Sequence, residues 1–180
     1  MKRTFRFLGV LLVCLTAFLM AGCTVTTYYT YEATFLVAPI AQDNTVRDEH
    51  YDFDQMMAFL DKMHEEEAYR TELATIVTEK LGENAQGAYS SLEERIKESF
   101  SIGFENNTNF TLGGTEVSAT ILVRVAAAED ENFRDVLSEA VKETAEAYIE
   151  ANLPYPNDCI GTYCEFVSDQ KGVHTQLDIL

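Results

Sequence analysis

The chain has 180 residues, a formal net charge of −17 and four cysteines. Such an acidic surface repels phosphate backbones, which argues against nucleic acid as a partner. After the first 23 residues, the remaining 157 are enough for one domain with its own core and too few for two.

The N-terminus has the pattern of a membrane-targeting leader. Residues 1–6 carry three basic side chains and no acid, residues 7–20 are almost wholly apolar, and an Ala-Gly pair precedes Cys23. A positive start, a short apolar run and small residues before a cleavage point are typical of a secretory signal. We therefore predict a signal or membrane-anchor segment over residues 1–23 and an extracytoplasmic domain over residues 24–180.

Two forms of attachment follow from this leader. The ending Ala21-Gly22-Cys23 resembles the lipobox of bacterial lipoproteins, in which the cysteine is lipidated, so Cys23 is the lipidation candidate. Met20 stands where that pattern usually has Leu. If the leader is retained instead, residues 7–25 are just long enough to span about 30 Å of hydrocarbon. Either form places the domain at the outer face of the cell membrane, with 10 basic residues against 30 acidic ones, a net charge of −20.

The first half of the domain is predicted to contain a strand followed by helices. Residues 24–39 are rich in tyrosine, threonine and β-branched residues, which favours a strand that Pro39 ends. Apolar residues at spacings of three and four predict a helix over 54–81, with Asp54 as its N-cap and a break near Glu65. A shorter helix is expected over 91–100, where Ser91 and Glu94 have the spacing of a capping box.

The second half is predicted to contain a hairpin, a helix and a last strand. Short strands are expected over 101–105 and 117–125, separated by a turn over 106–115. Asp130 is expected to cap a helix that runs to Ile149, and residues 164–167 suit a final strand. The order β-α-α-β-β-α-β predicts an α/β (α+β) domain, in which a small mixed sheet of about four strands carries helices on one face.

Cys159 and Cys164 lie close together in a segment that reads as a turn. Outside the cytoplasm, two neighbouring cysteines in a loop favour a disulfide. A zinc site would need two more ligands at similar spacing, and the sequence offers none. We therefore predict a disulfide between Cys159 and Cys164.

The sequence indicates no catalytic, metal or cofactor site. His64-Glu65 is the start of a zincin motif, but the position of the second histidine is Ala68. No nucleophile-elbow motif occurs, and the glycines at 113 and 114 precede a predicted strand instead of the helix that a nucleotide loop requires. We therefore expect a protein that is not an enzyme and that binds no cofactor.

The order of the segments resembles the Wzz/YveK family of chain-length determinants, which are polysaccharide co-polymerases. The resemblance rests on YEATFLV at 31–37 after the leader, on SLEERI at 91–96 before a strand, and on the strand at 117–127 followed by the helix at 130–149. It covers about residues 24–153 and lacks the family's second transmembrane helix.

This resemblance implies a membrane-anchored, non-enzymatic scaffold in the biosynthesis of a cell-surface polysaccharide, such as a capsule, exopolysaccharide or O-antigen. Such a scaffold would modulate chain length or export. Its partners would be the membrane, further copies of itself, and a polysaccharide polymerase or the glycan. The long helical segment at 54–81 would then supply faces between subunits. The alternative is an extracytoplasmic lipoprotein that binds or senses a ligand with the same fold and has no role in chain length.

Overall fold

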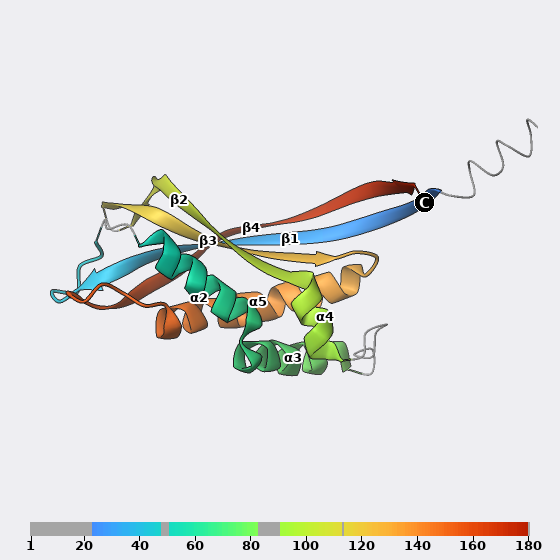
Figure 1. Ribbon diagram of the computed structural model, residues 1–180, viewed down its shortest axis with the longest axis horizontal. Helices are drawn as coiled ribbons and strands as arrows, with labels where there is room; N and C mark the ends of the chain where they lie inside the picture. The colour runs from blue at the N-terminus through green and yellow to red at the C-terminus, as the bar shows by residue number, and fades with distance from the viewer. Residues whose placement is uncertain (1–22, 48–50, 83–90, 113, 180) are drawn as a thin grey trace, which may run out of the picture.

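The computed structural model describes residues 23–47, 51–82, 91–112 and 114–179, which fold into a sheet covered by helices on one face (Figure 1). The sheet has the strand order β2-β3-β1-β4, and every neighbouring pair is antiparallel. Its strands are β1 (Cys23–Ala41), β2 (Phe100–Leu112), β3 (Thr115–Ala127) and β4 (Cys159–Ile179). The described helices are α2 (Phe53–Glu65), α3 (Glu67–Leu81), α4 (Leu92–Ser99) and α5 (Glu131–Asn152).

The predicted fold class and the order of elements are confirmed. The expected helix over 54–81 is divided at Glu66, whose φ of −66° and ψ of 120° are extended, and this break separates α2 from α3. The sheet is antiparallel throughout, whereas the sequence analysis expected a mixed one. β2 and β3 form a hairpin, and α5 crosses from β3 to β4, which lie on either side of β1 and are both antiparallel to it.

Side-chain caps begin three of the helices, as the sequence patterns indicate. Ser91 accepts a hydrogen bond from the backbone N–H of Glu94 at 3.1 Å, and Asp130 accepts one from Phe133 at 2.9 Å. The cap of α2 is Asp52, which accepts from the N–H of Gln55, and not Asp54. Each cap satisfies a backbone donor that has no partner within the helix.

The core lies between the sheet and the helices. Odd-numbered residues of β1, such as Phe35, point into it together with alternate residues of β3 and the inner stripe of α5. A fully buried aromatic or branched side chain stabilises the fold by roughly 1.5–3 kcal/mol. Tyr69 of α3 is also buried here, and its hydroxyl contacts the Thr144 hydroxyl of α5 at 3.2 Å.

All four strands are longer than predicted, and three of them differ in ways that affect the surface. β2 continues through most of the segment expected to be a turn, with a register shift between Asn106 and Phe110, and it pairs with β3 as far as Leu112 and Thr115. β1 also runs past Pro39. The pairing of β1 with β3 ends at Val37, so the N–H that proline lacks falls beyond that ladder, on a side where only an isolated bridge between Ile40 and Val46 is described. β4 has 21 residues, against the four expected.

Candidate functional site

The main feature outside the core is a ribbon of two strands. β3 ends where Ala127 pairs with Tyr29, while β1 and β4 continue together to the pair formed by Cys23 and Ile179. The ribbon comprises residues 23–28 and 174–179 and is about 20 Å long at a rise of about 3.3 Å per residue. Figure 1 shows it leaving the helical body, with the start of β1 beside the C-terminal end of β4.

The ribbon differs from the body in its surface. No residue from 23 to 31 is charged, in a chain with 30 acidic residues. Val25 in the ribbon is 63% exposed, and Val173, which borders the ribbon on β4, is 61% exposed. An isolated pair of strands is marginally stable in water, and three or more strands are usually needed. The ribbon is therefore a part of the fold that further contacts would stabilise.

The backbone of β1 offers hydrogen-bonding groups along the outer edge of the ribbon. The N–H of Tyr29 donates to the carbonyl of Ala128 at 3.3 Å, on the side of β3. Because successive residues of a strand turn these groups to opposite sides, odd-numbered residues face β3 and even-numbered ones face β4. Val25 and Thr27 therefore present their N–H and C=O groups on an edge where, among the residues described, no third strand lies.

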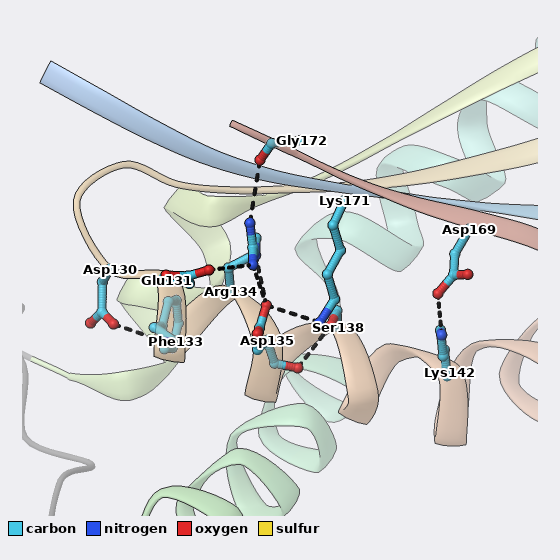
Figure 2. A network of polar contacts seen from close by, with 10 residues as sticks. All are labelled: Asp130, Glu131, Phe133, Arg134, Asp135, Ser138, Lys142, Asp169, Lys171 and Gly172. Atoms are coloured by element: carbon cyan, nitrogen blue, oxygen red, sulfur yellow. Dashed lines mark hydrogen bonds and ion pairs between the residues drawn. The ribbon is translucent and has the colours of Figure 1, made fainter. Parts of the chain in front are cut away.

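Arg134 on α5 holds the base of the ribbon (Figure 2). Its side chain is only 4% exposed and forms ion pairs with Asp135 at 2.6 Å and Glu131 at 3.3 Å. One guanidinium nitrogen donates to the carbonyl of Gly172 on β4 at 3.3 Å, and the group lies 5.3 Å from the ring centre of Tyr29 on β1. A single side chain thus contacts both strands at the point where β3 ends.

Two further lysines join α5 to β4 beside Arg134. Lys171 pairs with Asp135 at 3.1 Å, and Lys142 pairs with Asp169. Burial tends to raise the pKa of Asp135, but hydrogen bonds from Arg134 and Lys171 outweigh it and hold that pKa below its ordinary value. The hydrogen bond from Lys142 lowers the pKa of Asp169. These carboxylates therefore stay ionised and paired at neutral pH.

Carboxylates of α5 close the outer edge of β4 within the body. Glu150 accepts a hydrogen bond from the backbone N–H of Cys164 at 3.2 Å, and Glu146 accepts one from Phe166 at 3.1 Å. These side chains occupy positions that a neighbouring strand would otherwise take. The bulge that follows Phe166 further disrupts this edge.

The structure places the lipidation candidate, Cys23, as the first residue of β1 at the tip of the ribbon. Residues 1–22, which hold the predicted leader, lie outside the described residues. The alternative prediction of a transmembrane helix over 7–25 extends too far, because residues 23–25 belong to β1 and not to a helix. In the part of the chain that is described, no helix combines the length and hydropathy needed to cross a membrane.

The disulfide predicted between Cys159 and Cys164 is not present. Both cysteines lie in β4, where Cys159 pairs with Ala41 and Cys164 with Val37. An extended strand separates residues five apart by roughly 16 Å, whereas a disulfide joins α-carbons no more than about 7 Å apart. The turn-like sequence Ile-Gly-Thr-Tyr between them is strand because it pairs with β1. Burial, together with Glu146 and Glu150, raises the pKa of the Cys164 thiol.

The described residues contain no group of three or more side chains arranged to hold a metal ion. His64 stacks on Phe100 at the end of α2, and burial lowers its pKa. His174 stacks on Tyr28 in the ribbon, with ring centres 6.0 Å apart. One open hollow lies between Arg47 and Asp158, which form an ion pair, and it brings together no acid–base pair or nucleophile.

The helices that the sequence analysis assigned to contacts between subunits are occupied within the chain. Four apolar residues of α2, including Met56 and Met63, are buried in the core, whereas Phe53 at its start is 62% exposed. Those of α3, including Leu73 and Val77, are buried there too. Among the residues described, the ribbon is one surface that lacks such cover, with Val25 63% exposed.

Comparison with protein-family models, with curated proteins and with solved structures finds no match to this chain.

Sequence reasoning missed both the ribbon and Arg134. The uncharged run from 23 to 31 falls within a segment whose composition predicts a strand, but it does not indicate where the neighbouring strands end. Arg134 lies within the predicted helix. Acidic residues one and three positions away in the sequence indicate an arginine that forms ion pairs within its own helix. Its contacts with Tyr29 and Gly172 join segments about a hundred and about forty residues apart, which no local pattern reveals.

Proposed function

We propose that this chain is a membrane-anchored, non-enzymatic scaffold at the extracytoplasmic face, where it modulates the chain length or export of a cell-surface polysaccharide. The leader and Cys23 supply the attachment, and the ribbon serves as the connection between the anchor and the body. The observation that carries the proposal is the position of Cys23 at the tip of a ribbon that leaves the acidic body. The assignment to polysaccharide synthesis depends on the sequence resemblance.

Electrostatics supports the separation of the body from the membrane. The part of the chain after the leader has a net charge of −20, and anionic lipid repels it. The uncharged run from 23 to 31 is the segment that emerges at the membrane. A ribbon held at its base by Arg134 keeps the acidic helices away from the lipid surface, while the body remains available to a polymerase or a glycan.

The attachment is tested by intact mass of the protein isolated from membranes. Lipidation predicts loss of residues 1–22 and added acyl groups at Cys23, and Cys23→Ala abolishes both changes. A mass equal to that of the full chain would assign the anchor to the retained leader. Recovery of the full chain only from the soluble fraction would contradict anchoring in either form.

The role in polysaccharide synthesis is tested by deleting the gene in its native host and measuring the length distribution of surface glycans on gels. We expect the distribution to change and the wild-type chain to restore it. An unchanged distribution would refute this role and would favour the alternative, a lipoprotein that binds or senses a ligand on the same fold. A variant that keeps the body but lacks the anchor should fail to restore glycan length.

A further inference from the structure

The two edges of the sheet near the ribbon are protected to different extents. Along β4, carboxylates of α5 and a bulge obstruct pairing, and Asp169 and Lys171 add charges before the ribbon begins. Natural proteins use such features to prevent strands from associating at sheet edges. Along β1, the ribbon has neither a charged residue nor a bulge from Cys23 to Tyr28. Its sequence, CTVTTY, is rich in residues that favour strands.

We propose that the edge of β1 over residues 24–28 pairs with the same edge of a second copy of this chain. The pairing is antiparallel and places Thr26 opposite Thr26 of the second copy, and Val25 opposite Thr27. The proposed pairing rests on the proposed function, because the membrane anchor brings the two ribbons together. It identifies a second copy of the chain as one partner of the scaffold.

The direction of the backbone groups fits this register. Val25 and Thr27 turn their N–H and C=O groups outward, as the bond from Tyr29 to Ala128 indicates. Residues opposite each other in a hydrogen-bonded antiparallel pair exchange both bonds, so the two Val25–Thr27 pairs satisfy the outward groups of both copies. Pairing stops at Thr24 and Tyr28 because β3 takes the next position, beside Tyr29.

Stability favours a second copy as the occupant, and the uncharged run permits its approach. Two bodies that each carry −20 repel one another, and the uncharged run from 23 to 31 is where two copies approach without bringing acids together. The pairing also converts a two-stranded ribbon into a four-stranded sheet with the order β4-β1-β1-β4, which exceeds the minimum for independent stability.

The pairing is also compatible with both anchors in one membrane. A twofold axis perpendicular to the ribbon relates the two copies, so the same face of both ribbons is turned to the membrane. The face turned to the membrane is the one that continues the helix-free face of the sheet, because the acidic helices cover the opposite face of the sheet (Figure 1). The interface is small, and confinement at the membrane supplies the high effective concentration that a short interface requires.

The test uses the full chain reconstituted in vesicles of neutral phospholipid, with Thr26→Cys as a reporter. Opposite residues in a non-hydrogen-bonded antiparallel pair have α-carbons about 4.5 Å apart, within the range of a disulfide. We expect mild oxidation to convert most of the Thr26→Cys chain to a disulfide-linked dimer. The matched control is His174→Cys, which lies opposite Tyr28 on the other strand and should cross-link at least tenfold less. The wild-type chain sets the background from the native cysteines.

A second pair of variants separates edge pairing from folding. Val25→Pro in the Thr26→Cys chain removes an outward N–H and should reduce the dimer at least tenfold. Val173→Pro makes the same change on the outer edge of β4, because Val173 lies opposite Tyr29, and should leave the dimer intact. Circular dichroism confirms that both variants are folded.

Three results would overturn the pairing: no dimer of Thr26→Cys above background, equal cross-linking of His174→Cys, or equal dimer in the two proline variants. The cross-link is scored in both the vesicle-bound and the soluble fraction. A chain that is bound to vesicles but does not cross-link refutes the pairing and leaves the anchored scaffold intact. A chain that cross-links but does not bind vesicles supports the pairing and refutes the anchor.

Discussion

Replacement of Arg134 by methionine should lower the stability of the base of the ribbon more than the loss of an exposed arginine would. The guanidinium is 4% exposed and loses two ion pairs, a hydrogen bond to Gly172 and its contact with the ring of Tyr29. Hydrogen bonds to charged groups contribute roughly 1.5–3 kcal/mol each when buried. Both acidic partners are more than one-third exposed, and Asp135 keeps Lys171, so solvent and the second lysine reduce the loss.

We therefore expect Arg134→Met to lower the free energy of unfolding by about 2 kcal/mol, which corresponds to about 4–8 °C in Tm for a chain of this length. Urea unfolding of the full chain in mild detergent measures the change. Hydrogen exchange should accelerate most in residues 23–31 and 170–176, because the arginine contacts both strands there. Arg134→Lys keeps the charge without the planar guanidinium, so its free energy of unfolding should lie between those of the wild-type chain and Arg134→Met.

The matched control is Lys62→Met on α2. Lys62 pairs with Glu66 at 3.8 Å on the surface, with 61% of its side chain exposed, and its loss should change stability by less than about 0.5 kcal/mol. The reasoning is refuted if Arg134→Met is no more destabilising than this control. It is also refuted if exchange accelerates uniformly over the body while the ribbon is unaffected.

Three further predictions concern the body. Burial holds the pKa of His64 below its ordinary value, so the unfolded chain takes up a proton before the folded chain does, and the free energy of unfolding should fall as pH drops through about 6.5. Urea titrations between about pH 7 and 5 should show a smaller decline in stability for His64→Gln than for the wild-type chain. Cys159 and Cys164 should react with a thiol reagent only after unfolding, without prior reduction, and a pair that needs reduction first would contradict the strand geometry. Tyr69→Phe removes the contact with Thr144 and should cost about 1 kcal/mol in urea unfolding, with no loss expected for Tyr155→Phe on the exposed surface.

The elements that local rules describe were predicted well. The alternation from Val117 to Val125 identified β3, and the caps at Ser91 and Asp130 fixed the starts of α4 and α5. The break between α2 and α3 was expected near Glu65 and occurs at Glu66. In each case, neighbours within four residues supply the interaction that decides the structure.

The length of β4 and the state of its cysteines were not predictable in the same way. Residues 168–179 mix glycine, glutamine, aspartate and histidine and show little apolar alternation, because most of this strand is at an edge and exposed. They are extended because β1 supplies hydrogen bonds from the other end of the chain. The same pairing extends Cys159 to Cys164 and separates two sulfurs that a turn would have brought together.

The two halves of β1 have different roles because β3 is shorter than β1, with 13 residues against 19. Where both neighbours are present, alternation turns residues such as Phe35 into the core and saturates the backbone on both sides. Before Tyr29, β4 is the single described neighbour, and the same alternation leaves the groups of Val25 and Thr27 on an open edge. Arg134 sits at this transition and fixes the direction in which that edge leaves the body. The geometry that completes the core therefore also determines which part of the strand remains available to a partner.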